Sequence, residues 1–172
     1  MNWIKAAFFD RDGTLIKDVP YLSDLSQIEI LPGAIELCSF LQNLGFKLFV
    51  VTNQSGVARG FFDENFIKEA HNYLKKLFLN KGIFFERFYY CPHHPTKSVK
   101  IEYLKNCFCR KPNPGMLLKA AHDFNIDLSK SLMFGDKLTD IQVGLSVGCK
   151  SFYINEFFNC SNYDKFEFQS SI

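Results

Sequence analysis

Short apolar runs that alternate with longer amphipathic stretches constrain the fold of this 172-residue chain more than any other feature. The apolar runs predict buried strands over Ile4–Phe9, Lys47–Val51, Phe84–Tyr90, Ser131–Phe134 and Lys150–Ile154. The amphipathic stretches predict helices over Gly33–Leu44, Asp63–Asn80, Pro114–Phe124 and Thr139–Val147. This alternation is typical of an α/β fold, in which helices cover both faces of a parallel sheet. We therefore expect a three-layer, Rossmann-like arrangement.

The size and composition favour a single globular domain over residues 1–172. Hydrophobic residues make up 47% of the chain and charged residues 22%, which excludes global disorder. The net charge of +2, with no block of like charges, argues against a nucleic-acid partner. No apolar run is long enough to span a bilayer, and the first residues lack the pattern of a signal peptide. We expect a cytoplasmic monomer with no membrane partner.

Polar clusters follow three of the predicted strands. Asp10 and Asp12 come after the first, Thr52 after the second and Asp136 after the fourth. The carboxyl ends of parallel strands meet at one edge of a sheet, where ligands bind. A carboxylate pair at that edge favours Mg²⁺, a hard cation that prefers oxygen ligands. The alternative for the first pair alone is an Asp-Gly turn. For Asp136 and the nearby Asp140 two interpretations remain open: a further metal ligand, or a helix cap formed by Asp136 or Thr139.

A second cluster combines thiols and imidazole. Cys91 and His93 are followed, in the same segment, by Cys107 and Cys109. Three thiolates and one imidazole match a closed tetrahedral Zn²⁺ site, which is structural because no coordination position stays open. The alternative is an unliganded loop, and His94 competes as a ligand.

The remaining thiols and two basic residues carry weaker signals. Arg110 and Lys111, directly after the last cysteine, are able to hold phosphate or to form a solvated pair. Cys38, Cys149 and Cys160 are expected to be buried, inert thiols.

The order of these motifs resembles the haloacid dehalogenase superfamily of phosphohydrolases. The resemblance implies that Asp10 is the nucleophile, forming an aspartyl-phosphate, and that Asp12 is the general acid and base. It implies that Thr52 and Lys111 hold the phosphoryl oxygens. Mg²⁺ would be held by Asp10, the backbone carbonyl of Asp12, and Asp136. The short stretch between Asp12 and the first predicted helix leaves no room for a large cap domain.

Within that superfamily the chain resembles the zinc-loop group, and most of all its heptose-bisphosphate phosphatases. The matching stretches are Phe9–Thr14, Val51–Gly60, Tyr90–Pro95, Cys109–Leu118 and Gly135–Asp140. The resemblance implies loss of the 7-phosphate from a heptose 1,7-bisphosphate made for the lipopolysaccharide core. It also implies substrate contacts, besides those of Lys111, from Asp18, Tyr21, Asn53, Ser55, Arg110 and Lys137.

Two alternatives stay open. The histidinol-phosphate phosphatases share the nucleophile motif and the zinc loop, although the sequence Gln54–Gly60 and the paired His93 and His94 favour the heptose group. The other alternative is a module without turnover, which binds a sugar phosphate or is phosphorylated like a receiver domain.

One residue departs from the family's pattern. Pro20 stands before Tyr21 where the family usually has glycine, and proline restricts the backbone there.

Overall fold

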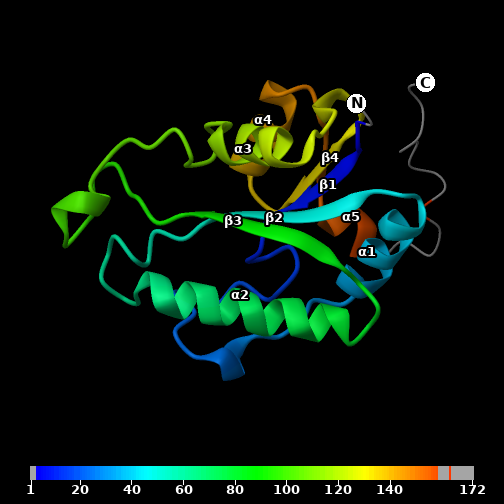
Figure 1. Cartoon of the computed structure of the whole chain (residues 1–172). Helices are drawn as coiled ribbons and strands as arrows, with labels where there is room; N and C mark the ends of the chain where they lie inside the picture. Colours follow the sequence, from blue (N-terminus) through cyan, green and yellow to red (C-terminus); the bar gives the residue numbers. More distant parts are fainter. Residues whose placement is uncertain (1–2, 159–162, 164–172) are drawn as a thin grey trace.

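A five-stranded, fully parallel sheet forms the centre of the molecule (Figure 1). The computed structural model describes residues 3–158 and 163. The strands are β1 (Ala6–Phe9), β2 (Lys47–Asn53), β3 (Phe85–Cys91), β4 (Leu132–Gly135) and β5 (Lys150–Tyr153), and their order across the sheet is β3-β2-β1-β4-β5. β1 therefore lies in the middle, hydrogen-bonded to β2 on one side and β4 on the other.

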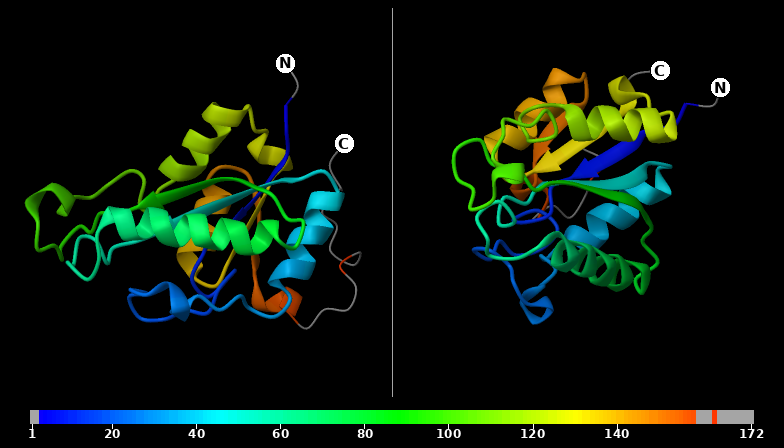
Figure 2. Two further views of the ribbon diagram at one scale, coloured as in Figure 1. Left: turned by 60° about the horizontal axis from the view of Figure 1, so that its bottom comes forward. Right: turned by 60° about the vertical axis from the view of Figure 1, so that its left-hand side comes forward.

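Helices cover both faces of this sheet (Figure 2). They are α1 (Ala34–Asn43), α2 (Glu64–Leu79), α3 (Gly115–Phe124), α4 (Leu138–Ser146) and the short α5 (Asn155–Phe158). α1, α2 and α5 pack on one face, whereas α3 and α4 pack on the other. Successive side chains of β1 belong to the two cores in turn. Ala7 and Phe9 lie in the core on the side of α1, α2 and α5, and Ala6 and Phe8 lie in the core on the side of α3 and α4. A strand buried on both faces needs an unbroken apolar sequence, which is what β1 has.

The predicted strands and helices are confirmed, with shifts of one or two residues at their ends. β2 continues to Asn53, because Thr52 and Asn53 still pair with β3. Sequence periodicity missed α5, since a helix of one turn is too short to show a period. Cys160 and most of the predicted tail lie outside the described residues.

The described residues form one α/β unit, and none of them builds a separate cap domain. None of the helices in that part of the chain has the length and apolar character that a membrane span requires. Three irregular segments extend from the carboxyl edge of the sheet instead. One runs from Asp10 to α1, and another connects β2 to α2. The third leads from β3 to α3 and forms the projecting left end of the molecule in Figure 1.

Candidate active site

Three carboxylates meet where β1 and β4 end. Asp10 follows β1 directly, and its backbone N–H donates to the Phe134 carbonyl of β4 over 2.9 Å. Carboxylate oxygens of Asp10, Asp136 and Asp140 lie within 4.8 Å of one another. The sheet thus brings the first and fourth strand ends together, as the topology predicts.

Lys111 is the counter-charge within this carboxylate cluster. Its side chain is only 2% exposed, and Nζ donates to Asp10 Oδ1 over 2.8 Å and to the Val51 carbonyl over 2.8 Å. Nζ also lies 2.6 Å from Asp140 Oδ1. Burial alone would lower the pKa of Lys111, but the carboxylates of Asp10 and Asp140 outweigh burial and raise it. Lys111 is therefore a fixed positive charge beside the predicted nucleophile.

Asp140 has a role that sequence reasoning did not identify. The sequence predicts it only as a further metal ligand. In the structure it holds Lys111 through Oδ1, and Oδ2 accepts the backbone N–H of Lys137 over 3.0 Å. The sequence carries no signal for this role, because the burial of Asp140 in the first turn of α4, which makes a charged partner necessary, emerges only in the structure.

Asp136 is the carboxylate with the least compensation. Its Oδ1 is buried and has no hydrogen-bond partner. Burial, reinforced by the charge of Asp10, raises the pKa of Asp136 to about 6. Gly13, at φ 76°, lies so close that an added Cβ would fall 2.4 Å from Asp136 Oδ2. An unpaired carboxylate oxygen beside two further carboxylates is the donor set that a hard divalent cation needs, so these residues fit Mg²⁺.

Asp12 is held apart from that cluster by a network of its own. Arg11 donates to its carboxylate through Nε (3.1 Å) and Nη2 (3.0 Å), and Gln54 Nε2 donates to Oδ2 over 2.8 Å. Gln54 also accepts from Arg11 Nη2 over 2.9 Å and donates to Thr52 Oγ1 over 2.9 Å. Sequence reasoning missed the site roles of Arg11 and Gln54, although both stand inside the polar clusters that follow β1 and β2.

Asn53 joins the end of β2 to the segment that carries Lys111. Asn53 Nδ2 donates to the Lys111 carbonyl, and the Lys111 backbone N–H donates to Asn53 Oδ1, both over 3.0 Å. The Asn53 amide thus bonds to the Lys111 backbone as the backbone of a neighbouring strand would. These two hydrogen bonds fix the position from which the Lys111 side chain enters the buried cluster.

A polar pocket opens beside Asp12. Several predicted substrate residues line it together, namely Asp18, Tyr21, Asn53, Ser55 and Lys137. Lys137 Nζ lies 3.4 Å from Asp18 Oδ2 across it. Arg110 is not among the residues that line this pocket. It donates instead to the His93 carbonyl over 3.2 Å.

The residue after Pro20 has an unusual backbone conformation. Tyr21 has a left-handed backbone with φ 52°, which is uncommon for a residue other than glycine. The loop still brings Asp18, Val19, Tyr21 and Leu22 to the pocket. We refer to residues 18–22 as the substrate loop.

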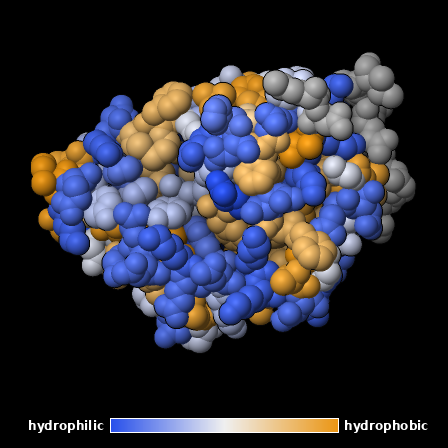
Figure 3. Space-filling view, viewed as in Figure 1, coloured by the Kyte–Doolittle hydropathy of each residue, from blue (hydrophilic) through white to orange (hydrophobic). Residues whose placement is uncertain are grey.

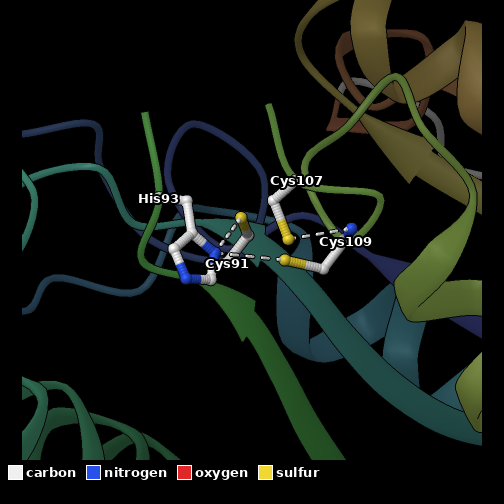
Figure 4. A group of neighbouring side chains, drawn as sticks. All are labelled: Cys91, His93, Cys107 and Cys109. Atoms are coloured by element: carbon white, nitrogen blue, oxygen red, sulfur yellow. Dashed lines mark hydrogen bonds between the residues drawn. The ribbon is translucent and has the colours of Figure 1, made fainter. Parts of the chain in front are cut away.

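The four predicted zinc ligands converge at the end of β3 (Figure 4). One ligand atom from each of Cys91, His93, Cys107 and Cys109 lies within 4.8 Å of the others. His93 Nδ1 is 3.6 Å from the sulfur atoms of both Cys91 and Cys109. The Cys109 thiol beside it lowers the pKa of Cys91 to about 6, which favours the thiolate that binds a metal. This set of donors fits a closed Zn²⁺ site.

The segment that supplies these ligands, residues 91–109, is named the Cys/His loop. It pairs with itself through backbone hydrogen bonds between His94 and Tyr103 and between Lys105 and His94. Val99 and Ile101 on it are 70% and 81% exposed. Figure 3 shows apolar side chains at the same left end of the molecule. The loop thus has little apolar core of its own.

Known proteins resemble this chain in sequence. A family model described as HAD-hydrolase-like matches residues 108–156. The D-glycero-beta-D-manno-heptose-1,7-bisphosphate 7-phosphatase of Yersinia pestis is 41% identical over 143 residues, which cover 83% of this chain and 76% of that protein. The protein of the same name from Escherichia coli K12 is 42% identical over 149 residues, covering 86% and 78%.

Solved structures resemble the fold. A HAD-like phosphatase from Mesorhizobium loti matches with a TM-score of 0.81 and 35% identity, over 86% of this chain and 70% of its own. The D,D-heptose 1,7-bisphosphate phosphatase of B. bronchiseptica, complexed with magnesium and phosphate, matches with a TM-score of 0.77 and 28% identity, over 90% and 85%. Identity above 40% over most of both chains, with the same fold, establishes the family: the chain belongs to the heptose-bisphosphate phosphatases of the haloacid dehalogenase superfamily.

Proposed function

We propose that this chain is a Mg²⁺-dependent phosphatase that removes the 7-phosphate of D-glycero-D-manno-heptose 1,7-bisphosphate for lipopolysaccharide core synthesis. Family membership supports the substrate, because relatives that are 41% and 42% identical carry that name. The buried cluster of Asp10, Asp136, Asp140 and Lys111 supports the chemistry, and it is the observation that carries the proposal.

Asp10 is the nucleophile of the proposed reaction. A carboxylate oxygen of Asp10 bonds to phosphorus while the ester P–O bond of the substrate breaks, which splits the hydrolysis into two steps. Lys111 and the Thr52 hydroxyl contact the phosphoryl oxygens and offset their charge. Mg²⁺, held by Asp10, Asp136 and the backbone carbonyl of Asp12, supplies further neutralisation of that charge when bound.

Asp12 moves the protons. Its carboxylic acid gives a proton to the leaving alcohol oxygen in the first step. In the second step the carboxylate takes a proton from the water that attacks phosphorus, and phosphate leaves as Asp10 is regenerated. Arg11 and Gln54 hold this carboxylate at the rim of the pocket, so the group lies beside the opening where a substrate enters.

The pocket receives the sugar in this proposal. Asp18, Tyr21, Asn53, Ser55 and Lys137 line it, and their donors and acceptors suit hydroxyl groups and a second phosphate. Arg110 reaches the substrate from the side of the Cys/His loop.

Zinc has a structural role in this proposal. Cys91, His93, Cys107 and Cys109 hold Zn²⁺, which orders the loop that precedes Arg110 and Lys111. We further propose that the chain works as a single-domain monomer in the cytoplasm.

The deciding experiment compares phosphate release from heptose 1,7-bisphosphate and from histidinol phosphate, with Mg²⁺ and with a chelator. We expect the bisphosphate to be much the better substrate and activity to require Mg²⁺. A preference for histidinol phosphate would instead favour the related phosphatases that share the nucleophile motif and the zinc loop.

The variant Asp12→Asn tests the alternative of a binding module that does not turn over substrate. We expect the variant to abolish phosphate release, and undiminished turnover would reject the role of Asp12.

A further inference from the structure

The short segment Ala58–Phe61 lies between the Cys/His loop and the substrate loop. The Ala58 carbonyl accepts the backbone N–H of Val99 over 2.8 Å and the Ser98 hydroxyl over 3.0 Å. Gly60 has φ 79°, and a Cβ added there would fall 2.8 Å from Val99 Cγ2. The backbone of this segment is therefore docked closely on the Cys/His loop.

The Arg59 side chain continues the link to the other loop. Its Nη1 donates to the Tyr21 hydroxyl over 2.9 Å, and its guanidinium carbon lies 5.7 Å from the centre of the Tyr21 ring. Its Nη2 lies 3.2 Å from His94 Nε2, whose ring is oriented by the Lys97 backbone N–H, 2.9 Å from Nδ1. Within residues 3–158, no carboxylate forms an ion pair with Arg59. Among the described residues, the hydrogen bonds of the Arg59 side chain thus go only to the two loops.

Tyr21 needs such support because its backbone is strained. A left-handed conformation is unfavourable for a residue with a Cβ, and it persists only where surrounding contacts impose it. Phe61 stacks on the Tyr21 ring with 3.9 Å between ring centres. Phe61 and Arg59 both belong to the segment that is docked on the Cys/His loop. Their contacts with the Tyr21 side chain are therefore anchored to that loop.

We propose that Arg59 is a positioning residue that couples the Cys/His loop to the substrate loop. It holds Tyr21 over the pocket, and through Tyr21 it sets the affinity for the sugar portion of the substrate without touching the reacting phosphate. The part of this inference that concerns substrate affinity rests on the proposed function. The coupling between the loops does not.

Amide hydrogen exchange of residues 18–22 tests the coupling without any substrate. In Arg59→Gln we expect exchange to increase by about three- to tenfold, the effect of losing one hydrogen bond and one cation–π contact. Arg87→Gln is the matched control, because Arg87 also contacts a tyrosine ring and a hydrogen-bond acceptor but lies on β3. We expect no change in the control. Unchanged exchange in Arg59→Gln, or an equal increase in both variants, would overturn the proposal.

Removal of the metal tests the direction of the coupling. Zinc chelation of the wild-type protein is expected to increase exchange at residues 18–22, and chelation of Arg59→Gln to add little. A wild-type protein that releases bound zinc on chelation while its substrate loop does not respond contradicts the coupling. So does an increase that is equally large in the variant.

Kinetics separate positioning from a general structural defect. For heptose 1,7-bisphosphate we expect Arg59→Gln to raise KM about three- to tenfold while kcat stays within about twofold. Arg59→Lys should recover part of the affinity, because lysine still reaches the Tyr21 hydroxyl. The kinetic parameters for p-nitrophenyl phosphate, which has no sugar, should stay at wild-type values. An equal fall of kcat for both substrates contradicts the positioning role. If the wild-type protein does not hydrolyse the bisphosphate, the proposed function fails while the exchange result still decides the coupling.

Discussion

The carboxylate cluster and the Cys/His loop are held in place by different means. Asp10, Lys111 and Asp140 are at most 5% exposed. Asp10 follows β1, Lys111 precedes α3 and Asp140 lies in the first turn of α4, and all three elements pack into the apolar cores. The Cys/His loop leaves the sheet at Cys91 and exposes apolar side chains such as Ile101. Packing of the whole domain therefore positions the first site. The second has little apolar packing of its own, and in the proposed function a shared Zn²⁺ would hold it.

Because of this contrast, substitutions at the two sites should have different effects on the protein. A change in the carboxylate cluster acts on charges that are buried in pairs, where an unpaired partner is expensive. A change in residues 92–106 of the Cys/His loop acts on a segment that contributes no residue to the two apolar cores. The loss in the first case is chemical or global, and in the second it is local.

The largest effect is expected for Asp10→Asn. The change removes the nucleophile and lowers phosphate release by at least about 10³-fold. The shape of the side chain is kept and Lys111 retains Asp140, so the far-ultraviolet circular dichroism spectrum should stay that of the wild type. Glu69→Gln, at an exposed carboxylate of α2 away from the pocket, is the control and should keep wild-type activity. Activity of Asp10→Asn within tenfold of the wild type would rule out Asp10 as the nucleophile.

The next effect is expected for Cys109→Ser, which removes one ligand of the Cys/His loop. The zinc content should fall below about half an equivalent per chain, because three remaining ligands bind the metal more weakly than four. Proteolytic cleavage should appear within residues 92–109 while the sheet stays folded. Cys149→Ser, at a buried thiol outside the cluster, should keep its zinc. Elemental analysis and limited proteolysis check both variants, and full zinc content in Cys109→Ser would remove Cys109 from the ligand set.

Acid should lower the free energy of unfolding of the protein through His71, a buried residue of α2. Burial, assisted by the charge of Arg11, lowers the pKa of His71 from 6.5 to about 3. The unfolded chain takes up a proton below pH 6.5 and the folded chain does not until about pH 3. Stability is therefore complete above pH 6.5 and falls with decreasing pH across that range, by about 1.4 kcal/mol per unit.

The measurement is urea unfolding at pH 7 and pH 5. Between these values the wild-type protein should lose about 2 kcal/mol more than His71→Leu, which has no proton to take up. His122→Gln, at an exposed histidine, should lose as much as the wild type. Equal losses in wild type and His71→Leu would show that this histidine does not control the acid response.

The smallest effect is expected for Lys47→Gln. Lys47 Nζ lies 2.8 Å from Glu86 Oε1, but the lysine side chain is 54% exposed and water screens the pair. Its loss should cost at most about 0.5 kcal/mol, and less in 1 M salt. The same geometry is thus worth little at the surface, in contrast to the pair between Lys111 and Asp10. A loss above about 2 kcal/mol in urea unfolding would show that exposure does not distinguish these ion pairs.

The alternation of strands and helices, the convergence of Asp10 with Asp136 and the thiol-imidazole cluster were all predictable from sequence. Each depends on local pattern or on the rule that parallel strands share one carboxyl edge. The Asp140 contact with Lys111 and the Gln54 contact with Asp12 were not. Side-chain partners far apart in sequence depend on rotamers and on packing, for which a single sequence carries no period or spacing.

The substrate loop shows the same limit in one residue. Pro20 indicated that this loop departs from the usual pattern, but proline constrains only its own backbone and that of its neighbour before it. The left-handed Tyr21 and its contacts with Phe61 and Arg59 emerge only in three dimensions.

The separation of 101 residues between Asp10 and Lys111 has a consequence for the order in which the protein is made. During synthesis Asp10 leaves the ribosome early, while its lysine partner and then Asp140 follow much later. Until they arrive, the most central strand of the sheet ends in a carboxylate with no counter-charge. Catalytic activity is therefore a late event in the life of the chain, and its appearance reports that the last third of the protein has joined the first.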